Sequence, residues 1–177
     1  MIILIEIVTI GKIPRQLLLD LAPKLVKAYA PLVEDYLFGA ELEMPPAAHD
    51  SRRKQYRSDI ILERIQHRIT GENRVLAITD VDIYMPTLNF IFGQAQYPGR
   101  IAVISLCRLD PAFYGKPPSY EGLLERATKE AIHELGHTFG LAHCPKPSCV
   151  MSFSNNILEV DRKSYTFCNA CRRKLRR

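Results

Sequence analysis

The segment 133–143, which reads HELGHTFGLAH, constrains the fold of this chain more than any other stretch. Residues four apart lie on one face of a helix, so His133 and His137 can direct two imidazoles at one point. Gly140 can adopt the left-handed conformation that ends a helix, and the resulting turn brings His143 back as a third nitrogen ligand. The pattern therefore predicts a helix that ends in a sharp turn around a metal ion.

Three neutral imidazoles with an open fourth position are typical of a catalytic zinc site, because structural sites close the tetrahedron with protein ligands. Glu134 lies beside the first ligand and is placed to hold a zinc-bound water. Zinc lowers the pKa of that water to about 7, and Glu134 would take its proton and later pass it to the leaving amine. We therefore expect metal-assisted hydrolysis of a peptide bond. The alternative is an accidental spacing of ordinary helix residues.

Four of the five cysteines form two close pairs, Cys144 with Cys149 and Cys168 with Cys171. Two such pairs separated by a loop are the sequence form of a four-cysteine zinc site. A bound metal would supply folding free energy to a segment that has few aliphatic residues. We expect two zinc ions per chain, one catalytic and one structural. Four unrelated thiols, or a redox pair at 168 and 171, are the alternatives.

Runs of β-branched and long aliphatic residues predict five strands. Three runs read as buried on both faces of a sheet, and two are shorter, one of them suited to a sheet edge. The polar stretch 47–54 reads as a loop. The buried runs are 2–10, 74–83 and 101–109, and the shorter runs are 38–44 and 90–97, the last being the edge candidate.

Helical spacing of apolar residues predicts three helices between and after these strands. The first starts near residue 14, and Pro23 and Pro31 should kink or divide it. The second takes Ser58 as its N-cap and ends near Gly71, and the third is the helix of the histidine motif. This order describes an α+β fold, with α/β-like layers, in which helices pack on a mixed sheet.

A chain of 177 residues has room for one domain and can bury a core without disulfides. We expect residues 1–140 to form an N-terminal subdomain that includes the active-site helix. Residues 141–177 would then form a small C-terminal subdomain stabilised by zinc. With 47% hydrophobic and 24% charged residues, the composition is typical of a globular protein. No run approaches the roughly 18 apolar residues of a membrane span, so no membrane partner is expected.

The apolar start of the chain lacks the basic region and the small-residue cleavage site of a secretory signal, and it reads as a first strand. We therefore expect a cytoplasmic, reducing setting, where clustered cysteines are more often metal ligands than disulfides. Cys107, which lies in an aliphatic run, is expected to be a small buried hydrophobic residue.

Basic residues gather near the C-terminus, where 161–177 hold seven Lys or Arg against one Asp, in a chain of net charge +5. A zinc-ribbon nucleic-acid binder is therefore one alternative function. No aromatic residues interleave with the run 172–177 and no groove-reading helix accompanies it, so nucleic acid is disfavoured as a partner. Lys163, Arg172 and Arg173 are expected instead to stabilise the cysteine thiolates.

The HExxHxxGxxH string, followed by the four cysteines and Met151, resembles the archaemetzincins, a family of metzincin zinc metalloproteases. The resemblance extends upstream to RKQY at 53–56, to TDVD at 79–82 and to NFIFGQA at 89–95. It therefore covers most of the chain, although the histidine and cysteine motifs are the specific part.

The resemblance implies a metzincin-like zincin fold, with a twisted mixed sheet backed by helices and a substrate cleft between two subdomains. An extended peptide would add itself to an edge strand by main-chain hydrogen bonds. A plain exposed edge is the alternative. Met151 would form an apolar floor under the catalytic zinc. The residues that we expect to contact substrate are Phe92, Gly93, Gln94 and Ala95.

One position departs from some metzincins, which carry a tyrosine two residues after the corresponding methionine. Phe153 has no hydroxyl, so zinc would be the main electrophile unless Tyr165 or a backbone N–H assists it. A zinc-stabilised binding protein that cleaves nothing is the remaining alternative, but it has no need of a water-activating carboxylate. We expect a zinc metallopeptidase acting on a peptide or protein. Nothing in the sequence specifies an oligomeric state.

Overall fold

A computed structural model describes residues 3–175. Its main sheet has the order β2-β1-β5-β8-β7, in which β7 pairs antiparallel with β8 and the other pairs are parallel. A smaller sheet has the order β3-β4-β6. The main sheet comprises β1 (Leu4–Ile10), β2 (Asp35–Phe38), β5 (Arg74–Thr79), β7 (Gly93–Ala95) and β8 (Ile101–Ser105). The smaller sheet comprises β3 (His49–Asp50), β4 (Gln55–Arg57) and β6 (Ile83–Tyr84).

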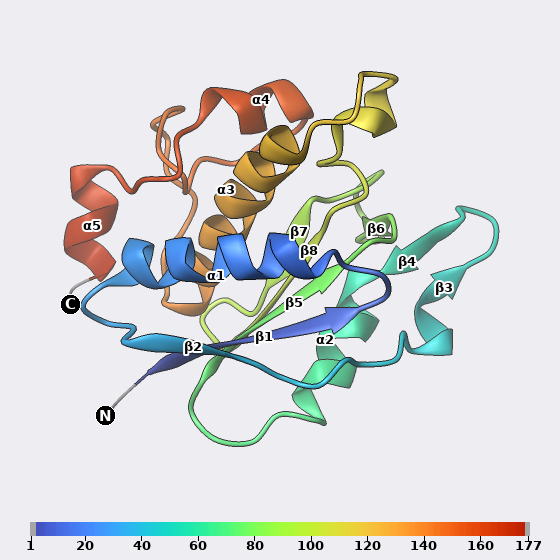
Figure 1. The fold of residues 1–177 in the computed structure, drawn as a ribbon, viewed down its shortest axis with the longest axis horizontal. Coiled ribbons are helices and arrows are strands. Elements are labelled where there is room, and N and C mark those ends of the chain that lie inside the picture. The colour runs from blue at the N-terminus through green and yellow to red at the C-terminus, as the bar shows by residue number, and fades with distance from the viewer. Residues whose placement is uncertain (1–2, 176–177) are drawn as a thin grey trace.

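Helices cover both faces of the main sheet (Figure 1). On one face α1 (Arg15–Tyr29) packs beside α3 (Tyr120–Thr138), and α2 (Ser58–Gln66) covers the other. Two short helices follow the histidine motif, α4 (Ile157–Arg162) and α5 (Asn169–Leu175). Single turns of 3-10 helix lie at Pro46–Ala48 and Pro111–Tyr114. The predicted α+β fold with a mixed sheet is confirmed.

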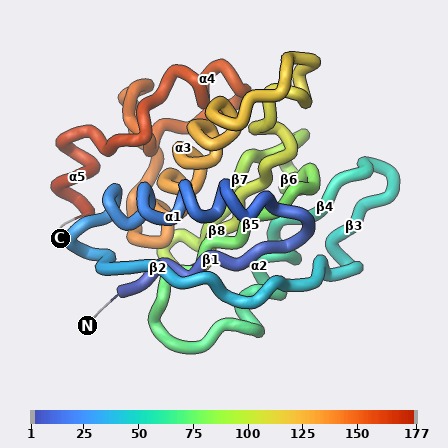
Figure 2. The backbone as a smooth tube through the Cα atoms, in the orientation of Figure 1, coloured from blue at the N-terminus to red at the C-terminus, as the bar shows by residue number. Residues whose placement is uncertain are grey.

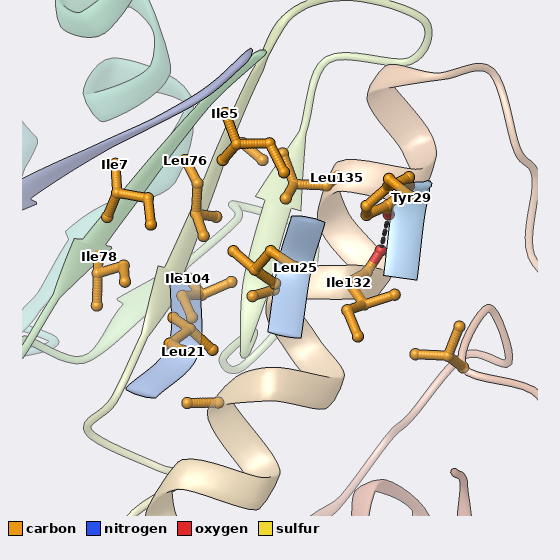
Figure 3. Packing of buried hydrophobic residues seen from close by; sticks show 14 of the residues in the cluster. Ile5, Ile7, Leu21, Leu25, Tyr29, Leu76, Ile78, Ile104, Ile132 and Leu135 are labelled. Atoms are coloured by element: carbon orange, nitrogen blue, oxygen red, sulfur yellow. Dashed lines mark hydrogen bonds between the residues drawn. The ribbon is translucent and has the colours of Figure 1, made fainter. Parts of the chain in front are cut away.

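Residues of the central strands alternate between two cores, because successive side chains point to opposite faces of a sheet. Ile5 and Ile7 join the larger core with α1 and α3, whereas Val8 joins the smaller core under α2. In the larger core, Tyr29 of α1 donates a hydrogen bond to the carbonyl of Ile132 in α3 (Figure 3). This bond ties the helix of the histidine motif to its neighbour.

The segment after the histidine motif packs against the same larger core. Val160, Phe167 and Leu175 are buried within it, and the chain trace shows α4 and α5 lying beside the layer of α1 and α3 (Figure 2). A subdomain boundary at residue 140 stays a prediction. Among residues 3–175, no helix has both the length and the apolar character that a bilayer span requires.

The strand predicted at 38–44 is wrong, because β2 ends at Phe38. Beyond that residue the chain stays beside β1 through hydrogen bonds from Gly39 N to Ile7 O (2.9 Å) and from Leu42 N to Thr9 O (2.8 Å). These two hydrogen bonds are three residues apart in the sequence, too far apart to continue the regular pairing of a β-strand. The predicted loop 47–54 contains β3, a strand too short for a sequence pattern.

The helix boundaries also differ from the predictions. Ser58 is the first residue of α2 rather than its N-cap, because its hydroxyl donates to Tyr84 O (3.1 Å) and contacts Gln94 Oε1 (2.5 Å) on other elements. The helix ends at Gln66, before Gly71. Pro23 lies inside α1 without dividing it, since the helix is anchored by buried residues on both sides of the proline.

The long strands predicted from apolar runs are shorter than expected. The run 74–83 is divided between β5, which ends at Thr79, and β6, which begins at Ile83. The run 101–109 ends as a strand at Ser105, and Cys107 follows it half-buried, with its thiol pKa raised by burial. The run 2–10 forms a strand from Leu4 to Ile10, and residue 2 of the run lies outside the described residues.

Candidate active site

The histidine motif lies on the last turns of α3 and the glycine turn after it. Ser119 begins the helix by accepting a hydrogen bond from Gly122 N (3.0 Å). Gly140 ends it with φ +84°, and Leu141 N returns to the carbonyl of Gly136 (3.0 Å). This left-handed turn, predicted from the sequence, brings His143 back toward the helix.

The three histidines offer ring nitrogens that all lie within 4.8 Å of one another. His133 Nδ1 donates to Val150 O (2.8 Å) and His137 Nδ1 donates to Leu141 O (2.7 Å), because a carbonyl oxygen can only accept. Both Nε2 atoms therefore carry lone pairs, and they face each other at 3.1 Å. Two lone pairs at that distance repel unless a cation joins them, and a tetrahedral zinc ion separates two nitrogens by about 3.3 Å. The donor set fits zinc.

Burial sets the protonation of these rings. It lowers the pKa of His133 well below the usual range, and it also lowers the pKa values of His137 and His143. The nearby Lys163 ammonium lowers all three further. A metal ligand must be the neutral imidazole, so the surroundings favour the form that binds.

The carboxyl of Glu134 is buried beside the rings. Burial raises its pKa well above the usual range, the Glu130 carboxyl raises it further, and the Lys163 ammonium opposes both. Gly93 of β7 lies so close that a Cβ at that position would be 2.7 Å from Glu134 Cγ. The two walls of the site therefore meet across a glycine.

A cleft of about 580 Å³ runs along these groups. Apolar side chains of the β6–β7 connection form much of the wall that faces α3. The structure thus brings the histidines, Glu134 and the predicted substrate strand into one cleft, as the sequence and the resemblance together suggest. The lining includes His133, Glu134, His137 and His143, with Phe92, Gly93, Gln94 and Ala95 opposite.

β7 is the last strand of the main sheet, as expected for the edge. Phe92 O accepts a hydrogen bond from Ser105 N of β8 (2.9 Å), and Gln96 N donates a hydrogen bond to Ile101 O at the other end of that strand (2.9 Å). Bonds alternate along an antiparallel pair, so Gly93 and Ala95 direct their N–H and C=O groups away from β8. Two residues therefore present main-chain groups at the free edge.

The four clustered cysteines offer sulfur atoms that also lie within 4.8 Å of one another. Cys144 Sγ lies 3.8 Å from Cys168 Sγ, and a tetrahedral zinc ion separates two thiolates by about 3.8 Å. Cys168 N donates to Cys149 Sγ (3.3 Å). The backbone N–H of Cys171 lowers the pKa of Cys168 to about 6, whereas burial raises the pKa of Cys149 and of Cys171. This set also fits zinc.

The two clusters share a short stretch of chain. His143 and Cys144 are consecutive, and Cys149 precedes Val150, whose carbonyl accepts from His133. Met151 comes next, is fully buried, and packs against Gly136 of α3 instead of lining the cleft. A role as an apolar floor under a catalytic zinc stays a prediction.

The basic residues do not all lie where the sequence suggested. Lys163 faces the active-site helix, with its Nζ 2.8 Å from Glu130 Oε1, a distance that suits an ion pair although the approach is poor for a hydrogen bond. Arg172 donates to Ala28 O (2.7 Å) and lies over the Phe167 ring. Only Arg173 of the three borders a pocket beside the cysteines. Arg176 and Arg177 lie outside the described residues.

The contacts of several cleft residues were not predicted from the sequence. Tyr97 lines the cleft with its ring centroid 5.7 Å from that of His137, and nothing in the sequence signals this contact. Glu130 could have been found, because it lies one turn before Glu134 on the same helix face. Phe153 lines the cleft 5.1 Å from the His143 ring, whereas Tyr165 is exposed and is not part of the lining.

Comparisons with known proteins identify the relatives of this chain. The sequence model of peptidase family M54 matches residues 43–177. The archaemetzincin of Pyrococcus abyssi is 46% identical over 97% of this chain and 94% of its own length. The crystal structure of Methanopyrus kandleri archaemetzincin superposes with a TM-score of 0.81 at 39% identity, over 98% of this chain and 96% of that one. The crystal structure of a zinc-dependent peptidase from Methanocorpusculum labreanum superposes with a TM-score of 0.84 at 28% identity, over 97% of this chain and 99% of that one.

The fold, the histidine cleft and these relatives together define a zinc metallopeptidase, a hydrolase with a peptide or protein as its substrate. The chain belongs to peptidase family M54, the archaemetzincins.

Proposed function

We propose that the chain hydrolyses peptide bonds with a zinc ion held by His133, His137 and His143 and with Glu134 as the general base. The observation that carries the proposal is one cleft that contains three clustered imidazoles, a buried carboxyl and a free strand edge. When bound there, zinc would polarise the substrate carbonyl and lower the pKa of water to about 7.

The chain's own residues supply the proton transfers. Glu134 accepts a proton from the attacking water and passes it to the leaving amine, because a carboxyl group positioned beside the reacting atoms can act first as a general base and then as a general acid. The Nδ1 bonds of His133 and His137 hold the ring orientation during these steps.

The substrate lies extended along β7. The outward main-chain groups of Gly93 and Ala95 pair with it as another strand would, while Phe92 and Gln94 keep β7 bonded to β8. This pairing positions a peptide bond beside Glu134, because Gly93 approaches that side chain closely.

The cysteine cluster binds a second, structural zinc, so a loaded chain carries two zinc ions. Four thiolates around one ion leave no open position for substrate, which separates this site from the histidine site. Thiolate ligation also requires reduced cysteines, and a cytoplasmic setting belongs to the proposal for that reason.

The proposal is tested by Glu134→Gln, with Glu121→Gln in the exposed first turn of the same helix as its control. We expect the first variant to lose cleavage of a random peptide mixture by about a thousandfold or more while both zincs stay bound. The control should cleave as the wild type does. Identical cleavage profiles for wild type and Glu134→Gln would refute the mechanism, and fewer than two zincs in a loaded chain would refute the two-site model.

A further inference from the structure

Four polar side chains that are not part of the cleft lining meet beside the β6–β7 connection. They come from the β3–β4 hairpin, from the turn before β6 and from the residues after β8, and Gln55 among them is 6% exposed. Neither proposed metal site uses them. We call Arg53, Gln55, Asp82 and Arg108 the polar clamp.

Arg53 and Gln55 hold two consecutive carbonyls of the β6–β7 connection. Arg53 Nη2 donates to Leu88 O (3.0 Å) and to Asn89 O (2.8 Å), and its Nε donates to Gln55 Oε1 (2.8 Å). Gln55 Nε2 donates to Asn89 O (2.9 Å) as well. The Arg53 guanidinium also lies 3.9 Å above the Tyr84 ring. A planar guanidinium suits this forked donation, which an ammonium cannot reproduce.

Asp82 and Arg108 complete the clamp, and Arg108 contacts Phe90, the residue after Asn89. Arg108 donates to both Asp82 oxygens at 2.8 Å, and Asp82 also accepts from Gln55 Nε2 (3.0 Å). The Arg108 guanidinium lies 4.2 Å from the centre of the Phe90 ring. The clamp therefore contacts Leu88, Asn89 and Phe90 in turn.

The held segment is the wall of the cleft. Residues 88–92 all line it and lead directly into Gly93 at the free edge. Between β6 and β7, the described chain makes one isolated bridge, Ile83 to Ile91, and otherwise has no ladder or helix. A few backbone hydrogen bonds hold its ends, and the side-chain bonds to Leu88 O and Asn89 O hold its middle.

We propose that the polar clamp positions the apolar wall 88–92 to accept a bulky apolar side chain of an extended peptide. The inference rests on the proposed function, since it assigns a substrate class to that cleft. Leu88, Phe90 and Phe92 give the wall its apolar character, and Phe153 faces the cleft as well. Arg53 and Arg108 are positioning residues that act through the wall.

The test uses Arg53→Met and its neighbour Arg52→Met. Arg52 is an exposed matched control whose backbone N–H, rather than its side chain, bonds Asp50. Each change is placed in the Glu134→Gln background, so that binding is measured without cleavage. Two short peptides serve as probes, identical except for a central Phe or Ser.

We expect Arg53→Met to raise the Kd of the Phe peptide about tenfold, because hydrogen bonds from a charged donor are lost. The Kd of the Ser peptide should change little, and Arg52→Met should match its parent on both. Arg53→Lys keeps the charge but not the fork, and should raise the Phe-peptide Kd by about threefold.

With Glu134 present, Arg53→Met should raise KM for the Phe peptide and leave kcat within about twofold, a split that general destabilisation would not give. Unchanged Phe-peptide affinity in both Arg53 variants, equal losses on both peptides, or no binding of either peptide would overturn the inference. A wild type that binds the Phe peptide in a clamp-dependent way but cleaves nothing would refute the proposed function alone.

Discussion

Gly93 determines how closely the strand edge can approach Glu134. A Cβ at this position would lie 2.7 Å from Glu134 Cγ and 2.8 Å from the backbone oxygen of Val103. Neither position leaves room, since real Cβ atoms essentially never come within 3.0 Å of other heavy atoms. A side chain at residue 93 would therefore displace the Glu134 carboxyl or the strand edge.

We expect Gly93→Ala to lower kcat by about a hundredfold, because a shift of about 1 Å in a catalytic group can cost that much. Gly122→Ala is the control, since its Cβ would come no closer than 3.1 Å to another atom and Gly122 does not line the cleft. Peptide cleavage rates of both variants, with zinc content, provide the measurement. Wild-type turnover in Gly93→Ala would show that Glu134 tolerates displacement.

The Lys163 and Glu130 side chains form a buried ion pair, with exposed fractions of 0% and 4%. Lys163→Met would leave the Glu130 charge buried without its partner, so we expect a loss of about 3–5 kcal/mol in the free energy of unfolding. Adding Glu130→Gln to the Lys163→Met variant should recover part of the lost free energy of unfolding. Arg162 is exposed, so the free energy of unfolding of Arg162→Met should stay within about 0.5 kcal/mol of the wild-type value.

Urea denaturation of these variants measures the effect, through the midpoint at constant slope. If Lys163→Met matched Arg162→Met, the pair would contribute nothing to stability. The sequence could not have paired these residues, because Lys163 was grouped with the cysteines on nearness along the chain alone.

At the scale of elements, the turn after α3 also requires a glycine, as the close approach at Gly93 does. Gly140 has φ +84° and open space where a Cβ would go, so a substitution there costs strain without a clash. Gly115 has φ +68°, the same open space and a place outside the cleft. The two positions separate backbone strain from the position of His143.

We expect Gly140→Ala and Gly115→Ala each to lose about 1–2 kcal/mol of stability, since the left-handed conformation is unfavourable for alanine. Only Gly140→Ala should also weaken zinc binding at the histidines, because it moves His143. Thermal unfolding and competition with a chelator measure the two effects. Equal zinc affinity in both variants would mean that the turn does not place the third ligand.

Elements with strong local signals were predicted well from the sequence. The strand at Leu4–Ile10 and the helix at Tyr120–Thr138 have long apolar patterns, and the latter also has Ser119 and Gly140 at its ends. The short sheet β3-β4-β6 was not predicted, because strands of two or three residues exist through their partners. β2 was misplaced for the same reason, since its pairing with β1 fixes its bounds.

For the whole molecule, the cysteine cluster joins the end of the chain to the common core. Cys149 and Cys171 belong to the larger core together with α1 and α3. We expect Cys168→Ser to lower the zinc content from two ions to one and to lower Tm, because a structural zinc contributes folding free energy. Cys107→Ser, outside the cluster, should keep both ions.

Metal analysis and thermal unfolding check this prediction, and a chelator added to wild type should lower Tm as well. Two zincs retained in Cys168→Ser would contradict a four-cysteine site. The histidine cluster and the two cysteine pairs were predictable because their members follow short spacings. The clamped wall was not, because Arg53 and Arg108 reach residues 88–90 only through the tertiary fold.

The stretch of chain shared by the two clusters has a consequence for maturation. An ion held by Cys144 and Cys149 would fix the position of His143 and of the Val150 carbonyl that orients His133. Because coupling between two binding sites is reciprocal, an ion at either cluster would favour binding of an ion at the other. When zinc is scarce, the two sites would therefore tend to fill together. A newly synthesised chain would then gain proteolytic capacity only after its C-terminal segment had matured.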